Sequence, residues 1–299
     1  MAATDVVRED LRGRIAFGPI ALTLPATFGL LLFFVAPFAT FAVYSFMTSE
    51  LFDVSQPFTT TSYETVLGSN VNRTLARNSF LTGLYAAAVT IAISLPIAYW
   101  LRYSAGRWRL PVLFLITATL FASYLVRIYA WRTILGRRGV LNTGLESLGL
   151  TDQPLDFLLY NRFAVTVALV HIFLPYTVLT LFAAFGPIGT SLLEAAQDLG
   201  AGAFRRWTRV VLPLVAAPAA SSFVFVFVLC ASDYVTPEFL GGNGGLMLGV
   251  RVKDAFIRIG DWPLGAATAI VMLAAFVVLY ALVSLALHLL GVRRIRFVS

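Results

Sequence analysis

Charged residues are scarce in this chain. Of its 299 residues only 12% are Asp, Glu, Lys or Arg, whereas 59% are hydrophobic and the mean hydropathy is +0.84. Ordinary soluble domains carry about 25% charged residues. This composition therefore excludes a water-soluble globular domain and indicates a membrane protein.

Residues with reactive side chains are also rare. The chain has one cysteine, Cys230, one lysine, Lys253, and two histidines, His171 and His288. A single cysteine excludes an internal disulfide, and two histidines beside it give no plausible metal site. The phosphate-binding loop G-x-x-x-x-G-K-[ST] requires a lysine, and no glycine loop precedes Lys253. We therefore expect Cys230 to pack in the core, and we expect no ATP site of this kind.

Long apolar runs are abundant instead. A helix that crosses a bilayer needs about 20 apolar residues, and six such runs lie near 19–46, 80–102, 110–129, 163–185, 210–231 and 263–291. The first run follows a charged N-terminus without a small-residue cleavage site, so we expect an uncleaved anchor rather than a signal peptide. The sequence predicts an all-α integral membrane protein with six transmembrane helices in a single domain over 1–299.

The distribution of arginine predicts the orientation. With the N-terminus inside, the inner segments hold 12 basic and five acidic residues, and the outer segments hold ten of each. The inner loops are much shorter, so their basic density is higher, as the positive-inside rule requires. Both termini are then cytoplasmic, and the longer loops 47–79, 130–162 and 232–262, where short helices are expected, face outside. The pI near 9.9 reflects this topology rather than nucleic-acid binding.

One polar segment separates two apolar runs on the inner side, EAAQDLGAGAFRRWTRVVLP over 194–213. Ser191 and Glu194 fit a capping box at a helix start. Ala195 and Ala196 are small enough for another surface to approach closely, and Gly200 suits the left-handed residue after a helix end. An amphipathic helix on lipid headgroups would explain the arginines of this segment but not the order of Glu, Ala, Ala and Gly.

A second helix is expected after this turn. It places Phe204, Trp207 and Val211 on one face and arginines largely on the other, and Pro213 inside the next apolar run is expected to kink it. The arginines are Arg205, Arg206 and Arg209.

The segment resembles the EAA loop of ABC-transporter permeases, EAA-x3-G-x9-I-x-L-P, with Val210 in place of Ile. The resemblance implies a cytoplasmic coupling loop over about 187–209 whose helix docks onto a separate ATPase subunit. This chain would then be a transport subunit rather than an enzyme and would bind no cofactor itself, with ATP and Mg on the partner ATPase. The coupling residues that it implies are Glu194, Ala195, Ala196, Asp198, Gly200, Arg205 and Arg206.

Two further segments resemble signatures of spermidine/putrescine-type permeases, closest to the B-type subunit. They are YLVRIYAWRTILGRRGVLN over 124–142 and DYVTPEFLGG over 233–242. The resemblance implies the type I importer fold in a bacterial inner membrane, a second homologous permease, a dimer of ATP-binding subunits and an external solute-binding protein. Relatives for opines or aminophosphonates share these motifs, so an importer for another small charged solute stays open.

A polyamine path requires carboxylates for charge and aromatic faces for cation–π contact. Asp233, Tyr234 and Glu238 at the outer end of the fifth run fit this, as do Tyr129 and Trp131 at the outer end of the third. These aromatics are equally typical of membrane-interface anchors.

Arg127 conflicts with a simple cation path. Either it pairs with an acid such as Asp233, or the cargo carries negative charge, because an unpaired charge at that depth is costly.

Two other classes are weaker. An ion-coupled secondary carrier would rely on Arg127, His171, Asp233 or His288 inside its spans, yet the chain shows no evident internal repeat. A membrane hydrolase would use one of the histidines, but neither G-x-S-x-G nor H-E-x-x-H is present.

Overall fold

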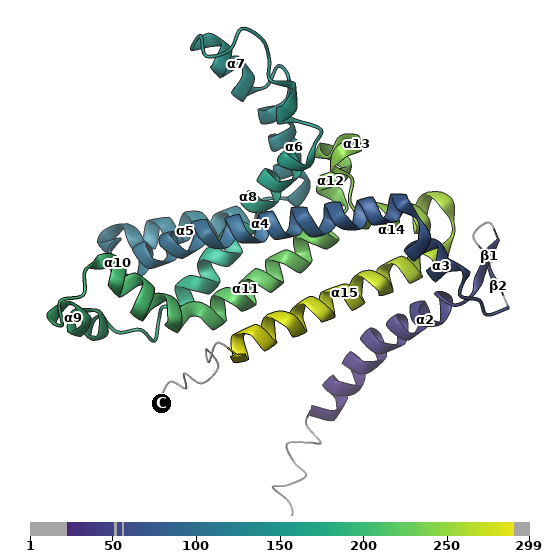
Figure 1. The fold of residues 1–299 in the computed structure, drawn as a ribbon, viewed down its shortest axis with the longest axis horizontal. Helices are drawn as coiled ribbons and strands as arrows, with labels where there is room; N and C mark the ends of the chain where they lie inside the picture. Colours follow the sequence, from purple (N-terminus) through teal and green to yellow (C-terminus); the bar gives the residue numbers. More distant parts are fainter. Residues whose placement is uncertain (1–22, 51–52, 56, 290–299) are drawn as a thin grey trace, which may run out of the picture.

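The structure, a computed structural model, describes residues 23–50, 53–55 and 57–289. Its long helices lie side by side, with short elements at both ends of the bundle (Figure 1). The longer helices are α2 (Ala36–Tyr44), α4 (Asn70–Tyr103), α5 (Arg109–Leu120), α6 (Tyr124–Leu135), α8 (Arg162–Ala184), α11 (Leu212–Ser232) and α15 (Trp262–Leu289). The predicted charged N-terminus and the basic tail 292–299 lie outside the described residues.

Short elements fill the connections. Helices lie in all three long loops, as predicted, and the first loop also contains an antiparallel β-ribbon in which Ser49 faces Val54. The short helices are α3 (Thr61–Gly68), α7 (Val140–Ser147), α9 (Thr190–Asp198), α10 (Ala203–Arg206), α12 (Val235–Leu240), α13 (Gly242–Gly245) and α14 (Leu248–Asp254), the strands are β1 (Thr48–Glu50) and β2 (Asp53–Ser55), the 3₁₀ turns are Gly106–Trp108 and Asp156–Leu158, and the π turns are Leu31–Val35, Trp207–Val211 and Ala255–Ile259.

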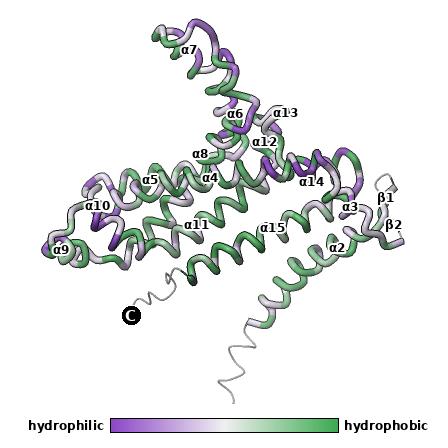
Figure 2. Tube along the Cα trace, in the orientation of Figure 1, coloured by the Kyte–Doolittle hydropathy of each residue, from purple (hydrophilic) through white to green (hydrophobic). Residues whose placement is uncertain are grey.

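Five helices in the described residues are long and apolar enough to cross a membrane: Thr23–Tyr44, Asn70–Tyr103, Arg162–Ala184, Ala203–Ser232 and Trp262–Leu289. Hydrophobic residues follow these helices, whereas hydrophilic residues gather around α10, α14 and the α6–α7 arm (Figure 2). A bent pair of shorter helices, Gly106–Leu120 and Tyr124–Ser147, makes a sixth span if the pair is counted as one. The all-α membrane fold of the prediction is therefore present.

The expectation of a continuous third span over 110–129 is wrong. The helix ends at Leu120 and restarts at Tyr124, and the two parts meet at an angle of 98°. Between them Ser123 has an extended backbone, with φ −55° and ψ 139°, which no α-helix contains. Hydropathy does not depend on the direction of the backbone. The apolar run therefore continues through the bend in the sequence, although the helix does not. The second part, α6, carries α7 away from the bundle (Figure 1).

Small residues bring α4, α8 and α11 close together. Ala86 and Ala87 of α4 and Ala168 of α8 are fully buried in one core with Cys230 of α11, which packs there as predicted. At Gly83 an added Cβ would lie 2.8 Å from the Cβ of Ala231. Close backbone approach through small residues is the usual packing of membrane helices, so these three helices form the rigid frame of the domain.

Candidate coupling loop and transport path

Helix α9 contains the Glu-Ala-Ala sequence and stands at one end of the bundle (Figure 1). Only Leu193 of this helix is buried, whereas Glu194 and Ala195 are exposed and Ala196 is half-buried. The predicted capping box is not formed. Gly189 is the N-cap residue, no side chain caps the helix, and Ser191 is already its second residue. Leu193 is therefore the one side chain of this helix that is buried, and most of the remaining surface of the helix faces outward.

Gly200 ends this helix as predicted. Its φ is +78°, in the left-handed region that favours glycine. The Gly200 N–H donates to the Gln197 carbonyl at 2.8 Å, and the Ala201 N–H donates to the Ala196 carbonyl at 3.0 Å. This pair of bonds is the Schellman motif, which satisfies the last carbonyls of a helix.

The following helix returns to the bundle. Trp207 and Val211 pack inward as predicted, but Phe204 is 80% exposed because it lies beyond the end of the bundle. A π turn over Trp207–Val211 comes just before Pro213, in which the Leu212 N–H donates to the Trp207 carbonyl, and the helix continues past the proline. The kink at Pro213 stays a prediction.

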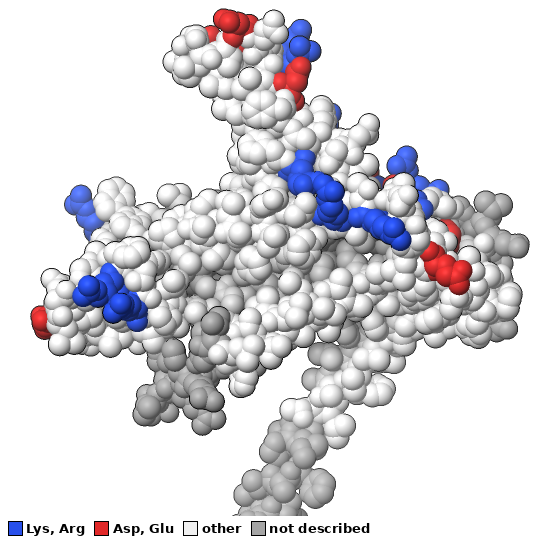
Figure 3. All heavy atoms as spheres, viewed as in Figure 1, with Lys and Arg blue, Asp and Glu red and all other residues white. Residues whose placement is uncertain are grey.

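Polar contacts tie the two helices of the loop together at an exposed surface. The Arg206 guanidinium donates to Gln197 Oε1 at 2.9 Å, while Asp198 and Arg205 are exposed. Leu199, 88% exposed, adds an apolar side chain to this surface. Basic side chains gather at this end and again at the opposite end, and this face of the bundle between the two groups is uncharged (Figure 3). A charged loop with exposed apolar side chains is suited to docking against another protein.

Asp233 caps a helix at the opposite end of the domain. Its carboxylate accepts hydrogen bonds from the N–H groups of Val235 at 3.2 Å and Thr236 at 3.0 Å, at the start of α12. The Thr236 hydroxyl in turn bonds to the hydroxyl of Tyr124 at 2.9 Å. The D-Y-V-T-P segment is therefore a corner that joins α11, α12 and α6, and Tyr234 lies exposed beside it.

Arg127 does not pair with Asp233. The guanidinium donates to the Ile172 carbonyl at 3.3 Å, and within the described residues no ion pair joins it to an acid and its Nε has no hydrogen-bond partner. The side chain is half-buried against α8. The predicted pairing of Arg127 with an acid such as Asp233 is therefore wrong for the described residues. The Arg127 guanidinium can still donate further hydrogen bonds.

The aromatic candidates have separate surroundings. The indole Nε1 of Trp131 donates to Nδ1 of His171 at 3.1 Å, which gives His171 a packing role. The Tyr129 ring lies 5.3 Å from the ring of Phe239, centroid to centroid. Both contacts join α6 to its neighbours, so part of the signature serves to hold α6 in place.

Glu238 is engaged by the single lysine. Lys253 Nζ lies 2.6 Å from Glu238 Oε1 and 3.3 Å from Asp254 Oδ1. These acids, first of all the hydrogen bond to Glu238, raise the pKa of Lys253. Glu238 is 40% exposed at its side chain and Lys253 only 15%. The two residues are fifteen positions apart along the chain, and no pattern in the sequence indicated that they pair.

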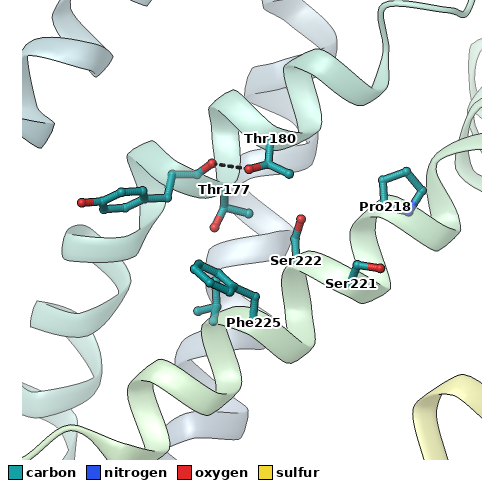
Figure 4. Close-up of a pocket in the computed structure, with 8 residues that line it drawn as sticks. Thr177, Thr180, Pro218, Ser221, Ser222 and Phe225 are labelled. Atoms are coloured by element: carbon teal, nitrogen blue, oxygen red, sulfur yellow. Dashed lines mark hydrogen bonds between the residues drawn. The ribbon is translucent and has the colours of Figure 1, made fainter. Parts of the chain in front are cut away.

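A cavity of about 420 Å³ opens between α8 and α11. Hydroxyl side chains and two aromatic rings surround it (Figure 4). Thr180 donates to its own helix at the Tyr176 carbonyl, but Ser222, 5% exposed, has no hydrogen-bond partner among the described residues. The lining residues are Tyr176, Thr177, Thr180, Pro218, Ser221, Ser222, Phe225 and Val226.

This cavity was not predicted. Its volume lies within the range of about 300–1,000 Å³ typical of small-molecule sites. The available signal was hydroxyl residues at helical spacing in two apolar runs, each close to a proline, namely Pro175 and Pro218. Such residues also occur in ordinary helix packing, so only the structure shows that they face one space.

Comparison with known proteins agrees with this geometry. Residues 76–296 match the family of the binding-protein-dependent transport system inner membrane component. The spermidine/putrescine transport system permease protein PotB of Haemophilus influenzae is 29% identical over 264 residues, which are 87% of this chain and 92% of that protein. PotB of Escherichia coli is 31% identical over 195 residues, 65% of this chain and 70% of that protein.

Two more comparisons extend the picture. The putative 2-aminoethylphosphonate transport system permease protein PhnU of Salmonella typhi is 30% identical over 165 residues, 55% of this chain and 57% of that protein. A crystal structure of a bacterial ABC transporter involved in alginate import superposes with a TM-score of 0.74 at 19% identity, over 97% of this chain and 99% of that chain. The fold, the EAA loop and these relationships confirm the predicted family: the chain belongs to the binding-protein-dependent transport system inner membrane components, as a multi-pass permease subunit of an ABC importer.

Proposed function

We propose that this chain forms half of the path through which an ATP-driven importer moves a polyamine, spermidine or putrescine, into the cell. The carrying observation is the similarity to spermidine/putrescine permeases over 87% of the chain, which includes both signature segments. The partner of this half is a second, homologous permease. Both termini then lie in the cytoplasm, as the positive-inside rule requires.

The coupling loop contacts a dimer of ATP-binding subunits, where ATP and Mg are bound. Glu194 and the exposed face of α9 supply the contact, and the small side chains of Ala195 and Ala196 allow close approach. Asp198, Arg205 and Arg206 form the charged rim of this contact. Closure of the ATPase dimer on ATP would push α9 as a rigid body about the turn at Gly200, and an external solute-binding protein would deliver the cargo.

The cavity between α8 and α11 offers a passage for a flexible polycation. The rings of Tyr176 and Phe225 provide faces for cation–π contact, worth about 0.5–2 kcal/mol each. The unpaired Ser222 hydroxyl can accept a hydrogen bond from an ammonium group. Asp233 adds negative charge at the outer side, where a cation would enter, and Glu238 lies there in an ion pair with Lys253 that an incoming ammonium group would have to displace.

Uptake of labelled spermidine and putrescine tests this proposal, in cells that make the complete complex with and without this chain. Chain-dependent uptake that unlabelled polyamines inhibit, and that opines and aminophosphonates do not, supports the polyamine assignment. Absence of polyamine uptake with an intact complex refutes it.

Arg127 supports a second candidate cargo, an aminophosphonate or a similar anionic solute. Its half-buried guanidinium has an Nε without a partner in the described chain, which suits a phosphonate or carboxylate. Under this alternative Arg127→Gln abolishes uptake of the anionic solute, whereas a polyamine importer tolerates the change.

A further inference from the structure

Two adjacent residues at the inner end of α4 hold the link that leads into the coupling helix. The Arg102 guanidinium donates from Nε to the Phe185 carbonyl at 3.3 Å and from a terminal nitrogen to the Gly186 carbonyl at 3.2 Å. The Tyr103 hydroxyl donates to the Ile188 carbonyl at 3.0 Å. Three carbonyls of the short link between α8 and α9 are therefore bonded to another span.

The Arg102 contact is suited to its location. The last carbonyls of a helix have no partners within the helix, and they form the negative end of its dipole. The Arg102 guanidinium lies just past the end of α8, bonds to both carbonyls and complements the dipole, while the Phe185 carbonyl also accepts from the Ile188 N–H at 3.1 Å. Its carbon Cζ also lies 5.4 Å from the centroid of the Tyr103 ring, within cation–π range.

Aromatic packing fastens the other end of the coupling loop to the same turn of α4. The ring centroid of Tyr99 lies 5.0 Å from that of Trp207, which follows the loop, and 6.0 Å from that of Phe185, which precedes it. Tyr103 adds a contact of 6.2 Å to Phe185. Phe185 is fully buried and Ile188 almost so, so both entry and exit of the loop are anchored on α4.

We propose that Arg102 and Tyr103 form a clamp that transmits displacement of α9 to α4, which makes them positioning residues for energy coupling. The proposal rests on the proposed coupling function. The link contains Gly186 and Gly189, and glycine backbones bend easily. With the clamp closed, the link and α4 move together. With the clamp open, the link absorbs the push on α9, and ATP hydrolysis proceeds without transport.

The far end of α4 has matching bonds, so the transmitted motion would reach the outer side. Asn78 Nδ2 donates to the Leu246 carbonyl at 3.0 Å, and the Leu248 N–H donates to the Ser79 hydroxyl at 2.8 Å. The 34 residues of α4 span about 50 Å at 1.5 Å per residue. This one helix therefore connects the coupling loop to the outer segment around α13.

Two variants and a control separate the clamp from general effects of charge. Tyr103→Phe removes only the hydroxyl that bonds to Ile188, and Arg102→Gln removes the guanidinium. Arg107→Gln is the control, because Arg107 is an exposed arginine at the same membrane face whose guanidinium lies over the Trp108 ring, 5.7 Å from its centroid. Each variant is assembled with its partner permease and a hydrolysis-deficient ATP-binding subunit in lipid nanodiscs, which also shows whether it folds and binds its partners.

Spin labels report the motion without any cargo. In a Cys230→Ala background, Thr190→Cys at the exposed first position of α9 and Thr74→Cys at the outer end of α4 are each paired with Tyr280→Cys on α15, and electron paramagnetic resonance measures both distances with and without ATP. In the wild type and in Arg107→Gln, ATP is expected to change both distances. In Tyr103→Phe and Arg102→Gln, the α9 distance changes as in the wild type while the α4 distance changes much less.

Two outcomes oppose the proposal in different ways. If both clamp variants transmit motion to α4 as fully as the wild type, the clamp is overturned and the proposed function stands. If ATP changes neither distance in the wild type, the coupling role of α9 fails and the clamp fails with it. With an active ATPase, the clamp variants should import about tenfold less solute per ATP hydrolysed, equivalent to ~1.4 kcal/mol of lost coupling, and Arg102→Lys should restore part of it.

Discussion

Asn142 holds the corner of the outer arm, and its replacement gives a quantitative test. The side chain is fully buried and makes three hydrogen bonds. Its Nδ2 donates to the Gly136 carbonyl at 3.1 Å and to the Leu155 carbonyl at 3.5 Å, and its Oδ1 accepts from the Leu155 N–H at 2.8 Å. These bonds join the end of α6, the start of α7 and the loop that follows α7.

Asn142→Ala leaves the Leu155 N–H without its partner, whereas the Gly136 and Leu155 carbonyls still accept from the N–H groups of Gly139 and Leu158. An unsatisfied buried N–H costs about 1–3 kcal/mol. Because Leu155 is only half-buried, water compensates in part. The expected loss is about 1–2 kcal/mol of local stability, which corresponds to roughly 5- to 30-fold more frequent opening of the arm.

Hydrogen exchange followed by mass spectrometry on the purified protein measures this opening in peptides over 140–147. Asn142→Asp should match or exceed the effect of Asn142→Ala at almost unchanged size, because it places a second oxygen against two carbonyls. Thr143→Ala, at an exposed neighbouring position, should leave exchange unchanged. Wild-type exchange rates in both Asn142 variants would refute the hydrogen-bond argument.

Three further changes have definite expected outcomes. Gly249→Ala should lower the free energy of unfolding by about 1–3 kcal/mol, because the added Cβ would lie 2.6 Å from a carbonyl oxygen at the end of α11. Gly244→Ala is the control and should be neutral in the same melting experiment, because its Cβ would have no atom within 4 Å. Ser222→Ala removes an unpaired buried hydroxyl, so the free energy of unfolding should stay unchanged or rise by up to ~1 kcal/mol. The same variant should lower cargo uptake severalfold. Unchanged uptake would exclude this hydroxyl from the path. A double-mutant cycle of Lys253→Met and Glu238→Gln should give a coupling free energy of about 0.5–1 kcal/mol. Because the pKa of Lys253 is raised, this coupling should be constant around neutral pH and decline only as the pH rises through the raised pKa. A decline already below pH 8 would contradict this expectation.

Local properties of the chain were readable from the sequence. Hydropathy located the membrane spans because apolar length is a sum over neighbouring residues, and it depends on no distant contact. The turn at Gly200 followed from the need for a left-handed residue after a helix. The order of Glu194, Ala195, Ala196 and Gly200 indicated the coupling loop through its resemblance to the EAA motif, and this motif is local because all of its residues lie within one helix and its end.

Contacts between distant segments were decided only by the tertiary structure. The same apolar run could continue straight or bend at Ser123, because its hydropathy is equal in both cases. Asp233 could pair with Arg127 or cap α12, and the nearby N–H groups of α12 prevailed at hydrogen-bonding distance. The cavity between α8 and α11 and the bonds of Arg102 to the coupling loop likewise depend on packing between separate helices, which the sequence of each helix does not encode by itself.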